Sequence, residues 1–246
     1  MAAKPKLKLL CLHGHLQNNE VFRSKIGSMR KALKSRCEFE FVEGPYEAAP
    51  HPLSTGSGGL PSAAEEGGVE IGGRSWWQWS DSEPDGRPSR AMHYSGWEPS
   101  LQVLIGAIKE HRPDGILGFS QGAAAGAMLL SCLCTEEAAG QLEEAGVQPP
   151  RFAVLIAGFL PRDPSFCALV TAARPSVPTL FVYGTSDALV PPTRSQELIA
   201  AFDPSTSRVF QHAGAHLSPT CSGAFKTALT DFLDEQASTV GSSGSG

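Results

Sequence analysis

Apolar and polar positions follow two alternating periods along most of this chain. Short runs dominated by apolar and β-branched residues are typical of buried strands, and they occur at 7–12, 39–42, 116–119, 153–156, 179–183 and 208–211. Between these runs, apolar residues recur at helical spacing, at Phe22, Ile26, Met29 and Leu33 after a candidate cap at Asn18 or Asn19, and then within 101–109, 123–134, 195–202 and 224–235. Strands that alternate with helices predict an α/β fold with a mostly parallel, doubly wound sheet and helices on both faces.

One long segment, residues 44–99, interrupts this alternation. It is crowded with Gly, Pro and Ser and then contains RSWWQWSD, with Trp76, Trp77 and Trp79 close together. A connection of this length is usually a functional loop, a lid or a disordered segment. The tryptophans argue against disorder near residue 76, while residues 50–70 are expected to be mobile. The sequence therefore predicts a single domain over residues 1–240 with an insertion or lid at about 44–99. The tail GSSGSG, residues 241–246, resembles a linker and is left out of the fold prediction.

Composition narrows the class of partner and the compartment. A hydrophobic content of 41% is sufficient for a large core, and a net charge of −5 provides no basic stripe for a nucleic acid. The sequence contains no run of about 18 apolar residues that would predict a transmembrane helix, so no stable membrane insertion is expected. The six cysteines are dispersed without a CxxC pair, which favours reduced thiols. We therefore expect a cytoplasmic protein, with the nucleus also accessible at 26.0 kDa.

The segment GFSQG, residues 118–122, places one serine between two glycines where a predicted strand gives way to a predicted helix. This is the G-x-S-x-G pattern in the setting of a nucleophile elbow, a strained turn that raises the Ser120 hydroxyl above the sheet edge. Gly118 and Gly122 fit this turn because it brings backbone segments too close for a side chain. The alternative is that Ser120 simply caps the helix.

A serine hydroxyl is a weak nucleophile unless a base takes its proton and a carboxylate orients that base. After a nucleophile elbow, the acid and then the histidine are expected on loops that follow later strands. Asp187 follows the strand 179–183, and His216 follows the strand 208–211. The sequence therefore predicts that Ser120, Asp187 and His216 form a catalytic triad.

These two assignments have rivals. Asp187 could instead be a turn residue in TSDA, and Asp163 and Asp203 are the competing acids. His212 is the competing base, although its position at the end of a strand favours a packing role. The other histidines precede Ser120 and violate the expected order.

The loop LHGHLQN, which follows the first strand, is the expected source of an oxyanion donor. Backbone N–H groups aimed at the developing negative charge are worth about 3–4 kcal/mol each. The expected pair is the N–H of Gln121 and the N–H of His15, with Leu16 as the alternative to His15. A tight turn around Gly14 without catalytic geometry is the other interpretation. His13 and His15 lack further ligands at metal-binding spacing, so no metal is expected.

Seven blocks together resemble the FSH family of serine hydrolases within the α/β-hydrolase superfamily. They are LCLHGHLQN, FVEGP, WWQW, GFSQGAA, LIAGF, LFVYGTSDALVP and HAGAHLSP, and they span most of residues 7–220. GFSQG and GTSD also occur in acyl-protein thioesterases, whereas HGHLQN with FVEGP and AGF is more specific. The resemblance implies an α/β-hydrolase fold and hydrolysis of carboxylic esters or thioesters without a cofactor, with Ser120, Asp187 and His216 as the triad.

The expected partner is a small-molecule acyl ester, hydrolysed through an acyl-enzyme intermediate. Apolar candidates for the wall of an acyl pocket are Phe159, Leu160, Leu189, Trp76 and Trp77, and they suggest a preference for medium to long acyl chains. The tryptophans could equally be ordinary core residues. An acyl thioesterase with the same triad and a non-catalytic interaction module are the alternative functions.

Overall fold

The computed structural model describes residues 6–48, 72–79 and 91–240. Its centre is a six-stranded sheet with the order β10-β9-β8-β7-β1-β2, and every pairing in this sheet is parallel. The strands are β1 (Leu7–Leu12), β2 (Cys37–Val42), β7 (Gly115–Phe119), β8 (Phe152–Ile156), β9 (Thr179–Gly184) and β10 (Ser207–His212). Each predicted strand is therefore present, and the doubly wound α/β fold is confirmed.

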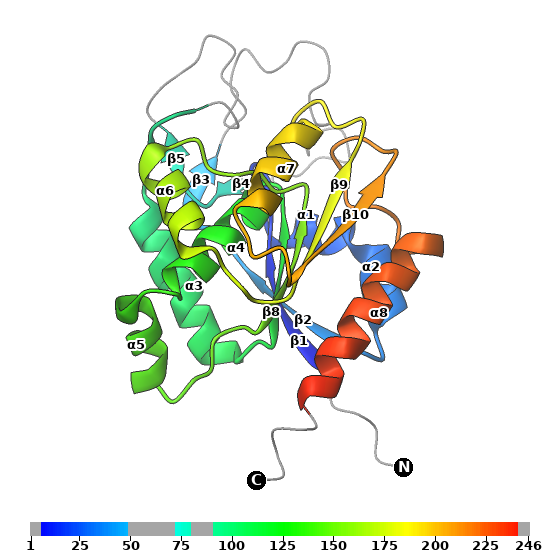
Figure 1. Ribbon diagram of the computed structural model, residues 1–246, viewed down its shortest axis with the longest axis horizontal. Coiled ribbons are helices and arrows are strands. Elements are labelled where there is room, and N and C mark those ends of the chain that lie inside the picture. The colour runs from blue at the N-terminus through cyan, green and yellow to red at the C-terminus, as the bar shows by residue number, and fades with distance from the viewer. Residues whose placement is uncertain (1–5, 49–71, 80–90, 241–246) are drawn as a thin grey trace.

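Helices cover both faces of the sheet. One face carries α1 (Asn19–Lys25), α2 (Gly27–Leu33) and α8 (Gly223–Val240), and the other carries α3 (Trp97–His111), α4 (Gln121–Cys132), α5 (Glu136–Glu144), α6 (Pro164–Ala173) and α7 (Pro192–Ala200). Figure 1 shows α2 and α8 on one side of the strands and α3, α5 and α6 on the other. Two hydrophobic clusters fill the layers between helices and sheet.

Strand β1, which reads LKLLCL, shows why the central strands are almost entirely apolar. Leu10 and Leu12 point into the cluster beneath α3 and α4, while Leu9 and Cys11 point into the cluster beneath α2 and α8. Successive side chains of a strand face opposite sides of the sheet. Since both sides are covered by helices, nearly every position of β1 must be apolar.

Local capping explains where several helices begin. Helix α1 starts after Asn18, whose side-chain oxygen accepts a hydrogen bond from the Val21 N–H at 2.9 Å. The helical pattern from Phe22 to Leu33 does not form one continuous helix, because α1 ends at a C-cap, Ile26, with φ of −93° and ψ of 19°. Helix α6, which the periodicity did not reveal, begins at Pro164, directly after its N-cap Asp163.

The order of the strands determines where a ligand can bind. From β1 the chain moves to β2 on one side and then returns to add β7, β8, β9 and β10 on the other. Strands β1 and β7 are therefore neighbours whose following loops diverge in opposite directions. The crevice outside the carboxyl ends of such a pair is the usual ligand site of open α/β sheets. The loop after β1 and the turn containing Ser120 both lie at this point.

The described parts of the predicted insertion form two small antiparallel ribbons. Strand β3 (Tyr46–Ala48) pairs with β4 (Gly73–Ser75), and β5 (Gln78–Trp79) pairs with β6 (Tyr94–Ser95). The expected mobility of residues 50–70 and the linker-like tail 241–246 concern residues outside the described part of the chain. Within the described part, no helix has the length and hydropathy needed to cross a membrane.

Candidate active site

The turn that carries Ser120 connects β7 directly to α4. Ser120 has φ of 53° and ψ of −118°, a backbone conformation that costs energy for any residue other than glycine. A Cβ on Gly118 would lie 2.6 Å from the Ala123 Cα, and a Cβ on Gly122 would meet the carbonyl oxygens of Leu12 and His13. Both glycines are therefore required by the closeness of the backbone. The Ser120 side chain makes no helix-capping hydrogen bond, so the simple capping role considered above does not apply.

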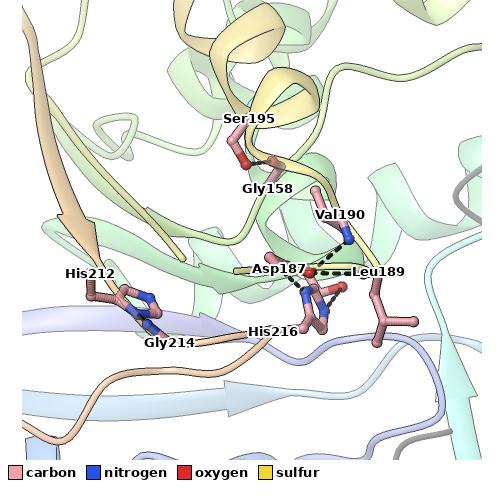
Figure 2. A network of polar contacts seen from close by, with 9 residues as sticks. Gly158, Asp187, Leu189, Val190, Ser195, His212, Gly214 and His216 are labelled. Atoms are coloured by element: carbon pink, nitrogen blue, oxygen red, sulfur yellow. Dashed lines mark hydrogen bonds and ion pairs between the residues drawn. The ribbon is translucent and has the colours of Figure 1, made fainter. Parts of the chain in front are cut away.

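The structure brings the three residues of the predicted triad together. His216 Nε2 lies 2.9 Å from Ser120 Oγ, and His216 Nδ1 lies 2.7 Å from Asp187 Oδ2. The other carboxylate oxygen of Asp187 accepts hydrogen bonds from the backbone N–H groups of Leu189 at 2.9 Å and Val190 at 2.8 Å, as Figure 2 shows. Asp187 therefore stabilises its turn with one oxygen and holds His216 with the other.

The hydrogen bonds of Asp187 also determine which nitrogen of His216 carries the proton. An ionised carboxylate can only accept hydrogen bonds, so Nδ1–H of His216 donates to Asp187. The Nε2 lone pair then faces Ser120 Oγ and accepts a hydrogen bond from its hydroxyl. The side chains of His216 and Asp187 are 8% and 1% exposed, and this exclusion of water strengthens both hydrogen bonds.

The rival residues have other roles. Asp163 caps α6 by accepting from the Ser165 N–H, and Asp203 accepts from the Ser205 N–H and hydroxyl. His212 Nδ1 accepts a hydrogen bond from the Gly214 N–H at 3.1 Å (Figure 2). His212 therefore lies at the end of β10, as expected, and its ring also holds the loop that leads to His216.

The loop after β1 is a tight turn, and only some of its backbone N–H groups donate hydrogen bonds within the protein. The Leu16 N–H donates to the Arg74 carbonyl at 3.0 Å, which removes Leu16, the alternative oxyanion donor, from consideration. Within the described part of the chain, neither the His15 N–H nor the Gln121 N–H has an acceptor. These two groups are therefore free to donate to a bound substrate.

The histidines of this loop are neutral structural groups. His13 is fully buried, its Nδ1 lies 2.8 Å from the Gly14 carbonyl, and its Nε2 accepts from the Gly44 N–H at 2.9 Å. Both nitrogens of His13 are thus occupied, which is incompatible with a metal ligand. Burial lowers the pKa of His13, and burial together with the nearby His13 lowers the pKa of His15 to about 4.

The lowered pKa of His15 predicts that the free energy of unfolding decreases as the pH becomes acidic. The unfolded chain binds a proton at His15 near its ordinary pKa of about 6.5, whereas the folded chain does so only near pH 4. The stability that the neutral His15 side chain gives the folded protein is therefore fully present above about pH 6.5 and is lost as the pH falls towards 4. Urea unfolding at pH 8 and pH 5 should show wild type losing up to about 2 kcal/mol more than His15→Phe. Equal losses would contradict this assignment.

The candidate acyl-pocket residues fall into two groups. Leu160, after β8, and Leu189, after β9, are partly exposed, whereas Phe159, also after β8, is only 4% exposed. Trp76 and Trp77 are 0% and 1% exposed and belong to the main hydrophobic cluster. The two tryptophans are therefore core residues, and they expose almost no surface that could contact an acyl chain.

Comparison with known proteins agrees with this architecture. Residues 1–227 match the family described as serine hydrolase (FSH1). The chain belongs to the FSH1 serine hydrolase family. Among similar proteins, the esterase OVCA2 of Bos taurus is 34% identical over 245 residues, covering 96% of this chain and 100% of the relative. The predicted family and the prediction of a serine hydrolase are therefore confirmed.

Solved structures resemble this FSH1 family member in fold. The crystal structure of esterase PE8 superposes with a TM-score of 0.61 at 16% identity and covers 95% of both chains. The acyl-protein thioesterase 2 of Zea mays superposes with a TM-score of 0.59 at 15% identity and covers 96% of this chain and 97% of the other. At such low identity these likenesses establish the shared α/β-hydrolase fold.

Proposed function

We propose that this serine hydrolase is a carboxylesterase that acts through Ser120, His216 and Asp187. The observation that carries the proposal is the unbroken hydrogen-bonded chain from Ser120 Oγ to His216 at 2.9 Å and on to Asp187 at 2.7 Å. Its first member lies on a strained elbow at the switch point of the sheet, where substrates of this fold bind.

The first half of the reaction acylates the serine. Ser120 Oγ attacks the ester carbonyl carbon as His216 Nε2 takes the hydroxyl proton, and Asp187 stabilises the resulting imidazolium. The carbonyl π electrons move to its oxygen, which accepts hydrogen bonds from the N–H groups of His15 and Gln121. The tetrahedral intermediate then expels the alcohol oxygen, and His216 Nε2–H protonates that leaving group.

The second half releases the acid. A water molecule occupies the position left by the alcohol and gives a proton to His216 Nε2 as its oxygen attacks the acyl carbon. The new tetrahedral intermediate breaks its bond to Ser120 Oγ, which recovers the proton from His216. The products are a carboxylic acid and the free enzyme, and no cofactor is consumed.

We expect medium to long acyl chains to be preferred over acetyl. Phe159, Leu160 and Leu189 are apolar, and the last two retain exposed surface on loops after the strands that lead to the site. Each methylene buried against them adds about 0.8 kcal/mol of binding. A series of p-nitrophenyl esters should therefore show kcat/KM rising from acetyl to octanoyl by about 10-fold or more. The fastest turnover on acetyl would refute this preference.

The same triad could also cleave a thioester, since both reactions proceed through an acyl-enzyme. Oxygen and sulfur esters with identical acyl chains separate the two activities. A carboxylesterase should show kcat/KM on the oxygen ester at least equal to that on its sulfur analogue. A thioester preference of about 100-fold would instead identify a thioesterase.

A further inference from the structure

The segment Arg74–Trp76, at the end of β4, contacts the oxyanion loop along its length. The Leu16 N–H donates to the Arg74 carbonyl at 3.0 Å, and the Arg74 N–H donates to the Gln17 carbonyl at 2.8 Å. Trp76 adds a third bond, from its indole Nε1–H to the His13 carbonyl at 2.8 Å. These bonds tie both ends of the loop that presents the His15 N–H.

The same segment is bonded to the elbow through the side chain of Gln121. The Ser75 hydroxyl has one proton, which it donates to the Trp77 carbonyl at 2.5 Å. Ser75 Oγ can therefore accept from Gln121 Nε2 at 3.1 Å, and Gln121 Oε1 accepts from the Trp76 N–H at 3.1 Å. The amide of Gln121 thus has a defined orientation between Ser75 and Trp76.

This network is dry and closely packed. Ser75, Trp76 and Gln121 are 2%, 0% and 2% exposed, so water cannot replace a lost partner. The Trp76 ring stacks on the His13 ring with centroids 5.1 Å apart, and the Ser100 hydroxyl donates to the Trp76 carbonyl. Trp76 is therefore held from several sides while its indole N–H holds the loop.

We infer that the side chains of Trp76 and Gln121 are positioning residues that fix the two oxyanion donors relative to each other. The inference rests on the proposed function, because it assigns the donors to the N–H groups of His15 and Gln121. These donors come from two segments far apart in sequence, and Arg74–Trp76 is bonded to both. Its direct partners are the loop backbone and the amide of Gln121, so its effect on the reaction passes through those groups.

The network should affect the stabilisation of the transition state more than the binding of the ester. The oxyanion forms only when Ser120 attacks. Slightly displaced donors therefore reduce the stabilisation of the transition state more than they reduce the binding of the ester. Displacements of this kind can cost on the order of 100-fold in rate. Loss of the network is therefore expected in kcat, with KM little changed.

Trp76→Phe is the sharpest test, because it removes the indole N–H and retains an aromatic ring. We expect kcat to fall by about 10- to 100-fold with KM within about twofold of wild type. The affinity for a trifluoromethyl ketone, which forms an oxyanion with the serine, should fall by the same factor as kcat/KM. Trp97→Phe is the matched control: Trp97 is 6% exposed and its ring packs edge-on against Trp77 and Phe166.

A second variant covers the case in which Trp76→Phe does not fold. Gln121→Met removes both side-chain hydrogen bonds and keeps the backbone N–H, and it should also lower kcat and ketone affinity together. If both variants fold, the double variant should lose less than the product of the two separate losses, since they disable one network.

The outcomes that overturn the positioning role are distinct from those that overturn the esterase. A loss in Trp76→Phe no larger than in Trp97→Phe, or a change in KM alone, refutes positioning while wild type remains active. Unchanged ketone affinity in a folded Gln121→Met refutes it as well. Absence of ester turnover in folded wild type would instead refute the proposed function.

Discussion

Ser120→Ala should abolish ester turnover, lowering kcat by about 10⁵- to 10⁶-fold, in line with removal of the nucleophile from other serine triads. The fold should be preserved, because the Ser120 side chain hydrogen-bonds to His216 and makes no helix cap. Hydrolysis of a p-nitrophenyl ester measures the loss. A fluorophosphonate probe, which reacts with activated serines, should label wild type and leave Ser120→Ala unlabelled.

Ser131→Ala provides the matched control for this experiment. Ser131 lies on the same helix, α4, is fully buried, and donates its hydroxyl to the Ala127 carbonyl at 2.8 Å. Its loss removes one buried serine hydroxyl without touching His216, so activity and labelling should stay within about twofold of wild type. Persistent labelling of Ser120→Ala, or a folded wild type that resists the probe, would contradict the assigned nucleophile.

Asp187→Asn should lower kcat by about 10⁴-fold while leaving the fold intact, which is the effect of the same change in a well-studied serine triad. One oxygen of Asp187 accepts from the backbone N–H groups of Leu189 and Val190, and an asparagine carbonyl can keep both bonds. The amide NH₂ then replaces the oxygen that faces His216 Nδ1. Because NH₂ is a donor, it favours the tautomer that carries the proton on Nε2, and that tautomer cannot accept a proton from Ser120.

Asparagine can keep the two hydrogen bonds to the backbone N–H groups of Leu189 and Val190, whereas alanine would lose them. Asp187→Asn therefore tests the contact with His216 alone. Measured kcat should fall with little change in KM, and urea unfolding should match wild type to within about 1 kcal/mol. Asp203→Asn is the control, since Asp203 was the rival acid and its carboxylate accepts hydrogen bonds from the N–H and hydroxyl of Ser205 in its own turn. A greater loss of activity in Asp203→Asn than in Asp187→Asn would overturn the assignment of the acid.

Much of the fold could be predicted because burial on both faces of the sheet makes most positions of the central strands apolar. Strand β1 was located to its end residues, Leu7 and Leu12, for this reason. Helix α5 was missed because only Ala138 and Leu142 are buried, which is too few to form a recognisable apolar stripe. Helix α6 was missed although Asp163 and Pro164 form a recognisable start.

By itself, the sequence determined the kinds of group at the site and their order. The G-x-S-x-G pattern of Gly118, Ser120 and Gly122 between an apolar run and a helical one specifies a sharp turn, and Asp187 and His216 follow strands that are recognised from their own residues. Such features depend on residues a few positions apart, so a single sequence contains them.

Tertiary structure decided which of the candidate acids and bases meet Ser120 and which contacts hold them in place. The hydrogen bond between Ser120 and His216 joins residues 96 positions apart, and it forms because the strand order brings the loops after β7 and β10 to one edge of the sheet. Packing likewise placed Trp76 in the core, against His13 rather than at an acyl pocket. Contacts of this kind depend on how distant segments pack around a common core, and no local period or spacing encodes that arrangement.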